Sequence, residues 1–422
     1  MRNLSLVCAF VLMLSGIYWS VGNAADWPHQ RGPELSGNVV AGTAVPAKLP
    51  AEPRIVWQGP VADGFAAPII SNGRIIYGDL QNGKETFHAI RFADAKKIWS
   101  DTLDNPHKDG FGTGPRCAAV SDGTVVLTQS CKAELHCLDA ATGKVIWKTN
   151  YLTDFGGTYT GEKGKTEGGA RHGYSASPCI DGDQVIALAG GKGAGVVCLD
   201  KKTGKPVWKS QDDLAAYAPP IVATLAGVKQ VVCFTVSGLI GLNRADGTLL
   251  WRVPMTTNYG RHVMAPVIYG DVVIAGSHEV GLIATRVINK GGTISSEEAW
   301  KRGKEIGPNF SSPVLIGDHF YLLTKKQVLC VDAKSGKETW AQDGLVTSSP
   351  DKGFASFLGM GDKVLLLNDA GELILFKADP AAYSEISRIQ ACGKNWCHPA
   401  YADGKLILRD AKNLICLDLM GK

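Results

Sequence analysis

An eleven-residue segment recurs along this chain and ends each time in tryptophan. Cys137–Trp147 reads CLDAATGKVIW, Cys198–Trp208 reads CLDKKTGKPVW, and Cys330–Trp340 reads CVDAKSGKETW. Looser copies end at Trp99 and Trp251. Self-similarity of this kind is the signature of a repeat architecture, in which one structural unit is used many times. The repeat therefore sets the fold before any functional residue is considered.

Each copy follows two apolar runs joined by Asp-Gly, Asn-Gly or Gly-Asp, which is a hairpin signal. The repeat thus contains four short strands. The first strand often follows a proline, as at Pro68, Pro178, Pro266 and Pro313, and proline suits the first residue of a strand. Because the pattern has period two and no long amphipathic helix is present, it indicates a β-propeller blade rather than a helical solenoid.

Second strands of the repeat can be counted along the whole chain. They lie near Ile75, Val125, Val185, Val231, Val272, Phe320, Val364 and Leu406. The last repeat reaches the end of the chain after three strands, whereas Arg54–Gln58 has the pattern of an outer strand with no blade before it. The seventh repeat has no Trp in Ser387–Gln390. The sequence predicts an all-β, eight-bladed propeller of four-stranded antiparallel blades, closed by the N-terminal strand.

The first residues predict export. Arg2 precedes an apolar stretch from Leu4 to about Leu14, and Gly22-Asn-Ala24 follows, which is the order of a secretory signal peptide cleaved after Ala24. A membrane anchor is the alternative, but the stretch is shorter than the roughly 20 residues of a spanning helix. We therefore divide the chain into a signal peptide (1–24), an N-terminal extension (25–52) and the propeller (53–422), in a periplasmic or secreted protein.

Net charge limits the kinds of partner that the chain can bind, and the cysteines indicate which thiols are paired and which are free. Removing Arg2 from 44 basic residues leaves 43 against 40 acidic ones, which argues against a nucleic-acid partner. Ten of the 11 cysteines remain after cleavage, since Cys8 is removed. Cys392 and Cys397, in a short loop of an exported protein, are predicted to form a disulfide. Buried free thiols are expected where the repeat frame needs a small side chain, namely at Cys137, Cys198, Cys330 and Cys416. No role is assigned to Cys117, Cys131, Cys179 and Cys233.

The eleven-residue frame resembles the tryptophan-docking motif of pyrroloquinoline-quinone (PQQ) dehydrogenase-type propellers, which have eight blades. The opening DWPHQRGP at Asp26–Pro33 also resembles a signature of exported members. The resemblance implies that each Trp packs against the small residue of a neighbouring blade, and the small residues are Ala89, Cys137, Cys198, Gly241 and Cys330. The docking residues it implies are Trp57, Trp99, Trp147, Trp208, Trp251 and Trp340.

Two branches of that superfamily give different functions. Quinoprotein dehydrogenases bind PQQ and Ca²⁺ over the ring axis, and many carry a disulfide between adjacent cysteines. This chain has no Cys-Cys dipeptide, is much shorter, and offers no assignable calcium set. The other branch contains the non-enzymatic propeller lipoprotein of outer-membrane barrel assembly, which this chain resembles in length but not in a lipidation cysteine. We therefore expect a monomeric, non-catalytic scaffold for a protein or small ligand, with no cofactor. The alternatives are a PQQ- and calcium-dependent alcohol or sugar dehydrogenase, and an extracellular sugar- or peptide-binding protein.

Loops that precede the first strands are expected to converge on the axis at one face of the ring. They form a polar and aromatic funnel for a small ligand, a peptide or an anion. The alternative is that these side chains bond loop carbonyls and hold the blades together. No catalytic residue is assigned, and no ligand spacing supports a metal site from His172, His262 and His398. The predicted ligand-binding residues are Arg171, His172, Tyr174, Asn258, Tyr259, Arg261, His262, Asn309, Trp396 and His398.

Overall fold

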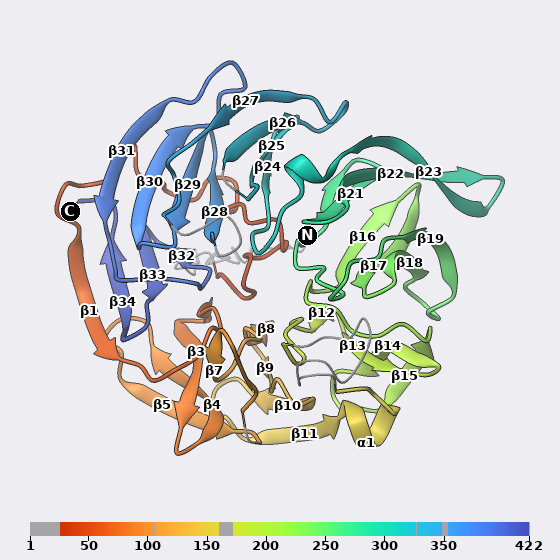
Figure 1. Ribbon diagram of the computed structural model, residues 1–422. Coiled ribbons are helices and arrows are strands. Elements are labelled where there is room, and N and C mark those ends of the chain that lie inside the picture. The colour runs from red at the N-terminus through yellow and green to blue at the C-terminus, as the bar shows by residue number, and fades with distance from the viewer. Residues whose placement is uncertain (1–25, 105, 160–171, 326, 348–352, 422) are drawn as a thin grey trace, which may run out of the picture.

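The computed structural model describes residues 26–104, 106–159, 172–325, 327–347 and 353–421. Over these residues the chain forms eight four-stranded antiparallel sheets arranged around one axis (Figure 1). The predicted eight-bladed propeller is confirmed. The predicted signal peptide and Arg171 lie outside the described residues.

Four strands follow one another in each of the first four blades. Blade 1 has β2 (Ile69–Ser71), β3 (Arg74–Gln81), β4 (Lys84–Arg91) and β5 (Lys97–Thr102). Blade 2 has β8 (Val120–Ser121), β9 (Val125–Gln129), β10 (Glu134–Asp139) and β11 (Val145–Asn150). Blade 3 has β12 (Cys179–Asp181), β13 (Gln184–Gly191), β14 (Ala194–Asp200) and β15 (Pro206–Ser210). Blade 4 has β16 (Ile221–Leu225), β17 (Val228–Thr235), β18 (Gly238–Asn243) and β19 (Leu249–Pro254).

The remaining blades complete the ring. Blade 5 has β20 (Val267–Tyr269), β21 (Val272–Ser277), β22 (Gly281–Lys290) and β23 (Thr293–Arg302). Blade 6 has β24 (Val314–Ile316), β25 (His319–Leu323), β26 (Val328–Asp332) and β27 (Glu338–Gln342). Blade 7 has β28 (Ala355–Met360), β29 (Lys363–Asn368), β30 (Glu372–Lys377) and β31 (Glu385–Gln390). Blade 8 has β32 (Ala400–Ala402), β33 (Lys405–Arg409), β34 (Asn413–Asp418) and β1 (Arg54–Pro60).

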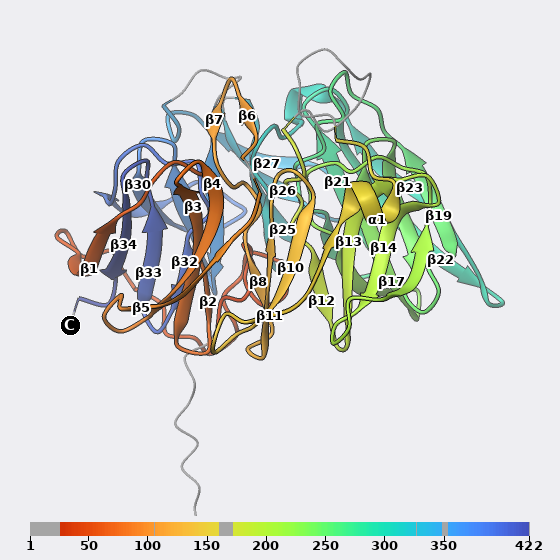
Figure 2. The same cartoon turned by 90° about the horizontal axis from the view of Figure 1, so that it is seen from below.

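The ring closes as predicted, because β1 pairs with β34 and supplies the outer strand of blade 8. Trp57 lies opposite Cys416 in this ladder. Outside the blades are a short hairpin of β6 (Lys108–Asp109) and β7 (Gly112–Thr113), helix α1 (Tyr151–Phe155) and a 3-10 turn η1 (Lys304–Ile306). Figure 2 shows the β6–β7 hairpin projecting from one face of the ring. No described helix is long and apolar enough to cross a membrane.

Tryptophans join neighbouring blades through the turn between the third and fourth strands. The Trp99 indole N–H donates to the carbonyl of Ala140 in the next blade (3.1 Å), and a Cβ on Gly143 would lie only 2.5 Å from the Trp99 ring. Glycine is therefore needed at this turn for close packing as well as for its positive φ of 71°. The same bond to a carbonyl of the next blade joins Trp57 to Phe92, Trp147 to Lys201, Trp208 to Arg244, Trp300 to Ala333 and Trp340 to Asp379.

The small residue of the frame has a different place from the one that the resemblance implied. Cys137 pairs with Trp147 across two strands of its own blade, and Ala89 pairs in the same way with Trp99. The neighbouring blade instead contributes the turn glycine and its carbonyl partner. The expected packing of each Trp on a neighbour's small residue is thus wrong.

Blade 5 departs from the repeat, and this corrects one expected docking residue, Trp251, and adds Trp300. Its β22–β23 hairpin is longer and has no Asp-x-x-Thr-Gly turn, so Trp251 of blade 4 meets no turn glycine there. Trp251 instead lies over Gly241 of its own blade. Its indole N–H donates to the side-chain oxygen Oε1 of Gln230 at 2.7 Å. Trp300, which the sequence frame missed, docks blade 5 onto blade 6.

The N-terminal extension runs inside the ring and connects blades that are distant in sequence (Figure 1). Trp27 bridges to Ile70 of blade 1, and Asn38 bridges to Gly359 of blade 7. Farther along, the Leu49 N–H donates to Ser387 Oγ (2.9 Å), where blade 7 lacks its tryptophan. Leu49 is buried there among the side chains of blades 7 and 8. The extension therefore seals the one seam that the repeat leaves without an outer-strand aromatic.

Candidate functional site

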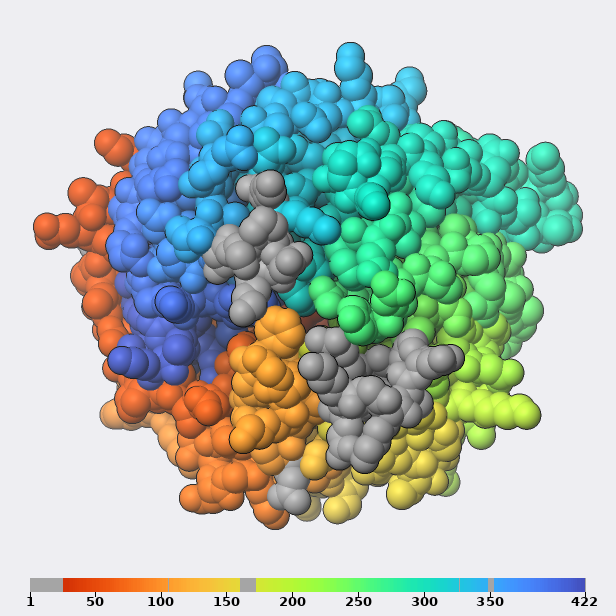
Figure 3. Space-filling view, in the orientation of Figure 1, coloured from red at the N-terminus to blue at the C-terminus, as the bar shows by residue number. Residues whose placement is uncertain are grey.

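All eight connections between blades meet at one cavity on the ring axis. Its volume is about 160 Å³, and it lies next to the turn of the β6–β7 hairpin, on the side of the ring that Figure 3 shows. Every connection contributes at least one side chain, and the N-terminal extension adds another. The lining residues are Gln30, Phe65, Ala67, Phe111, Arg116, His172, Ser175, Tyr217, Val263, Phe310, Ser312, Phe354, Trp396 and His398.

One position in each blade connection points into this cavity. In six blades it lies three residues before the proline that leads the first strand. In blade 2 it lies three residues before Ala119, and in blade 7 it directly precedes β28. Around the ring this position is occupied by Phe65, Arg116, Ser175, Tyr217, Val263, Phe310, Phe354 and Trp396. Sequence reasoning named only Trp396 among these eight. A fixed offset from the leading prolines was the signal that could have identified Phe65, Ser175, Tyr217, Val263 and Phe310.

The cavity wall is a continuous run of aromatic contacts. Phe111, in the turn of the β6–β7 hairpin, has its ring centroid 5.3 Å from His172, 5.8 Å from Phe310 and 5.7 Å from Trp396. Trp396 in turn stacks on Phe354, with centroids 5.7 Å apart and planes 17° apart. Edge-to-face and stacked rings at these separations stabilise one another beyond their buried area. The result is a rigid apolar wall with flat surfaces.

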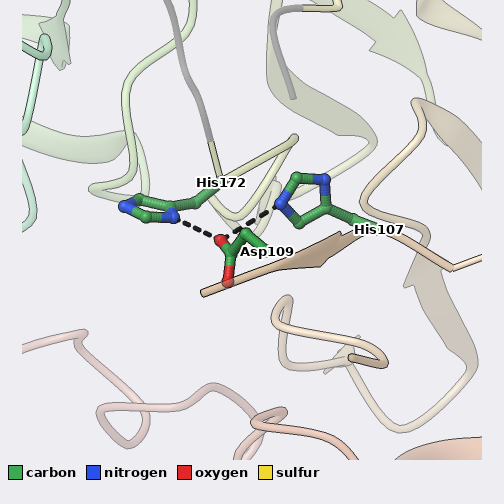
Figure 4. Close-up of side chains that lie close together, drawn as sticks. All are labelled: His107, Asp109 and His172. Carbon is green, nitrogen blue, oxygen red and sulfur yellow. Dashed lines mark hydrogen bonds and ion pairs between the residues drawn. The ribbon is translucent and has the colours of Figure 1, made fainter. Parts of the chain in front are cut away.

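Asp109 is the centre of a polar network beside this wall (Figure 4). Its Oδ2 atom lies 2.5 Å from His172 Nδ1 and 3.2 Å from His107 Nε2, while Arg116 Nη2 donates to Oδ1 at 2.8 Å. Burial opposes ionisation of Asp109, but the two imidazoles and the Arg116 charge lower its pKa far below the usual range. The carboxylate therefore stays charged and fixes His172 and Arg116 at the edge of the cavity.

His107, Asp109 and His172 are also a set of residue types that binds metals. One ligand atom from each lies within 4.8 Å of the other two. Two imidazoles and a carboxylate are ligands that suit Zn²⁺. Arg116 already pairs with this carboxylate, however, and its positive charge disfavours a cation at the same place.

The predicted ligand-binding residues divide into two groups. His172, Trp396 and His398 line the cavity. Arg261 and Asn309 lie beside it, because Arg261 Nη1 donates to Asn309 Oδ1 (3.1 Å) and the guanidinium lies 5.2 Å from the centroid of the Phe310 ring. These five residues are brought together as expected, although binding itself remains a prediction.

Tyr174 and His262, two of the predicted ligand-binding residues, are buried in the core and bond to backbone carbonyls there. The Tyr174 hydroxyl donates to the Ala189 carbonyl (2.9 Å) within the core between blades 2 and 3. His262 is fully buried, stacks on Phe234 with centroids 4.2 Å apart, and has Nδ1 2.6 Å from the Thr235 carbonyl oxygen. Neither lines the axial cavity, so their assignment to it is wrong.

Asn258 and Tyr259 lie on the outer surface of the same face. Asn258 donates to the Glu279 carboxylate through its backbone N–H (2.8 Å) and its side-chain amide (3.1 Å). Tyr259 is 43% exposed, and the Arg261 guanidinium lies 5.4 Å from its ring centroid. These residues belong to the rim of the face rather than to the cavity.

The expected disulfide between Cys392 and Cys397 is absent, since both are free thiols. Asn395 organises the intervening loop by accepting from the Cys397 N–H (3.0 Å) and donating to its carbonyl (3.1 Å). Cys392 Sγ instead contacts the Gly371 carbonyl at 3.9 Å. The side-chain bonds of Asn395 therefore hold the loop without a covalent link. Cys137, Cys198, Cys330 and Cys416 are buried and free.

PQQ does not fit the axial cavity, and the described residues do not assemble a calcium site there. The quinone is a planar molecule of three fused rings, whereas a cavity on the order of 150 Å³ holds a single benzene ring. A larger cleft of about 720 Å³ lies alongside and includes Asp369 and Asp410. Their carboxylates accept backbone N–H groups of Thr347 (2.9 Å) and Gly393 (2.8 Å). Calcium needs six to eight oxygen ligands, and within the described part of the chain only the trio around Asp109 brings three ligating groups together.

Comparison with known proteins gives one family and one fold. The profile of the family described as outer membrane protein assembly factor BamB matches residues 83–342. The assembly factor BamB of Yersinia pestis is 23% identical over 340 residues, covering 76% of this chain and 77% of that protein. The crystal structure of BamB from Moraxella catarrhalis has a TM-score of 0.59 at 15% identity, and covers 87% of this chain and 100% of that one. Quinohemoprotein alcohol dehydrogenase from Comamonas testosteroni has a TM-score of 0.65 at 13% identity, with 94% and 81% covered.

Proposed function

This chain belongs to the family described as outer membrane protein assembly factor BamB, and we propose that it is an exported, non-enzymatic scaffold that binds a protein partner during outer membrane protein assembly. Family membership supports the process, and the architecture of the ring supports the mode of action. Recognition residues on a rigid scaffold gather on its loops, because loops can vary without disturbing the core.

The observation that carries the proposal is the rim at the hairpin-bearing face. Tyr259 is exposed there beside Arg261, which also contacts Phe310 at the cavity mouth. Tyrosine and arginine dominate the binding energy of protein interfaces. The partner therefore docks across this rim, and the aromatic mouth lies beneath the contact.

A dehydrogenase role has weaker support. The likeness to quinohemoprotein alcohol dehydrogenase lies in the fold, at 13% identity. The axial cavity is lined by no carboxylate among the described residues and is too small for the quinone. The exported scaffold therefore remains the function that the residues support best.

Site-specific photo-crosslinking in native cells tests the proposal. A crosslinking amino acid at position 259 should capture an outer membrane protein or a component of its assembly machinery. Position 98 is a matched control, since Ile98 is 42% exposed on outer strand β5, away from the rim, and Tyr259 is 43% exposed. Capture at position 98 but not at 259 would refute docking at the rim.

Two further measurements test the broader claim. Cell fractionation should place the mature chain outside the cytoplasm, and a cytoplasmic chain would overturn the proposal. Dye-linked dehydrogenase activity after addition of PQQ and Ca²⁺ should be indistinguishable from that of buffer. Saturable turnover of an alcohol or sugar would show that the chain is an enzyme.

A further inference from the structure

The axial cavity has the size and the walls of a site for one aromatic ring. Its volume of about 160 Å³ is close to the roughly 150 Å³ of a cavity that holds benzene. Phe111, Phe310 and Trp396 contact one another around it, and Phe354 continues the wall. A flat ring can therefore meet aromatic faces and edges on several sides at once.

The charges around the cavity favour an anion. Arg31, in the N-terminal extension, is fully buried and donates to the backbone carbonyls of Leu35, Ser36, Ser312 and Pro313. No acidic side chain of the described chain forms an ion pair with it. Burial lowers the pKa of Arg31 to about 10, so it still carries its charge at neutral pH. This buried positive charge thus has no carboxylate to balance it.

The imidazole next to Arg31 does not change that balance. His398 lines the cavity, and burial together with the nearby Arg31 charge lowers its pKa to about 3. His398 is therefore neutral at physiological pH. Arg116 adds a second cation at the wall, and its charge is matched by Asp109. Arg31 is therefore a charge next to the cavity that no described carboxylate pairs with.

Arg116 is held in a position from which it can bind a ligand. Its Nη2 atom donates to Asp109, and its guanidinium carbon lies 5.2 Å from the centroid of the Phe65 ring. Its Nη1 atom makes no hydrogen bond within the described part of the chain, and its Nε atom has no partner there either. Asp109 and Phe65 thus fix the guanidinium while donors remain for another acceptor.

The geometry points to a binding site for a monocyclic aromatic carboxylate, with the ring among Phe111, Phe310 and Trp396 and the carboxylate on Arg116. This site lies beneath the proposed partner-docking rim and does not depend on it. Arginine and carboxylate form charge-assisted hydrogen bonds, and the surrounding rings exclude water that would weaken them. Asp109 acts as a positioning residue, because it holds Arg116 without contacting the ligand.

Isothermal titration calorimetry of the mature chain tests the site with benzoate as the probe. Benzoate should bind with a Kd below about 1 mM at one site per chain. Benzamide has the ring without the charge, and cyclohexanecarboxylate has the charge without the aromatic ring, so each should bind at least about tenfold more weakly. Benzylamine carries the opposite charge and should not bind.

Variants separate the site from general folding. Arg116→Gln should weaken benzoate at least about tenfold, while Arg116→Lys should retain part of the affinity because it keeps the charge. Arg286→Gln is the matched control, since Arg286 lies on β22, half exposed and far along the outer hairpin. Unchanged thermal unfolding of Arg116→Lys verifies that the fold is intact.

Three results would overturn the inference. They are the absence of benzoate binding by the wild-type chain, equal binding of benzylamine and benzoate, and unchanged benzoate affinity in Arg116→Gln. Crosslinking at position 259 remains a separate measurement, so loss of the ligand site would leave the docking proposal standing.

Discussion

Replacing the turn glycine under a docking tryptophan should destabilise the ring far more than replacing a glycine of the same conformation elsewhere. Gly204 has a φ of 69°, and an added Cβ would lie 2.6 Å from Cδ2 of Trp147 in the preceding blade. Gly182 has a φ of 61° with nothing within 4 Å of an added Cβ. Gly204→Ala and Gly182→Ala therefore share the backbone strain, and they differ in the contact.

The magnitude follows from these two parts. Left-handed backbone costs about 1 to 2 kcal/mol for an alanine, and this is the whole effect expected for Gly182→Ala. Gly204→Ala must also displace the Trp147 ring, which overpacks the seam by about 1 to 3 kcal/mol. If the ring moves, it also loses the 2.7 Å bond from its N–H to the Lys201 carbonyl, worth about 1 kcal/mol. The excess over Gly182→Ala should thus be about 2 to 4 kcal/mol.

Urea unfolding of the two variants, followed by circular dichroism, measures this difference in unfolding free energy. The comparison holds when the unfolding free energies of both variants depend on urea concentration with the same slope. A double variant, Trp147→Phe with Gly204→Ala, provides a second test. The smaller phenyl ring leaves room for the methyl group, so the double variant should lose less stability than the sum of the single ones. Equal stability of Gly182→Ala and Gly204→Ala, or strict additivity in the double variant, would refute the docking argument.

Three other predictions follow from the fold and its buried groups. Deleting residues 50–60 should abolish cooperative unfolding, because it removes β1 from blade 8 and exposes a sheet edge; an unchanged thermal transition would contradict ring closure. Thiol labelling should modify Cys392 first, since the other described cysteines are more deeply buried. Rapid labelling of Cys137 in the native state would contradict its burial in the core. Burial raises the pKa of Glu85 to about 7, so the folded chain keeps a proton that the unfolded chain has lost above about pH 4.5. The free energy of unfolding of the wild type should therefore fall as the pH rises from about 4.5 to 7, relative to that of Glu85→Gln. The same pH dependence in both proteins would show that Glu85 does not titrate with a raised pKa.

The blades could be predicted from sequence because their signals are local. Strand periodicity, turn glycines and the tryptophan frame all lie within one repeat, so even the closure by Arg54–Gln58 followed from counting strands. Trp300 was missed because the β22–β23 hairpin replaces the usual turn with Lys290–Thr293. The docking geometry was also misassigned, because the frame does not reveal that each docking tryptophan pairs with the small residue of its own blade and bonds to the turn of the next, as Trp99 does with Ala89 and Ala140.

The site was harder to predict because it is assembled from all eight connections. Arg116 and Phe111 lie in a segment without any motif, and only the ring places them beside Trp396 and Phe310. Tyr174 and His262 have residue types that are common in binding sites, yet their bonds to Ala189 and Thr235 use them in the core. Residue type alone could not separate these two cases.

The cavity-lining position in each blade connection has a consequence for how such rings diversify. The eight side chains there belong to eight separate loops, while the tryptophan seams lie in the outer strands. A change at one of these positions alters the cavity wall there and its contacts with adjoining wall residues, and leaves the tryptophan seams in place. Randomising those eight codons alone would thus sample many binding chemistries on a constant framework, and a selection from that library could give new receptors without redesign of the fold.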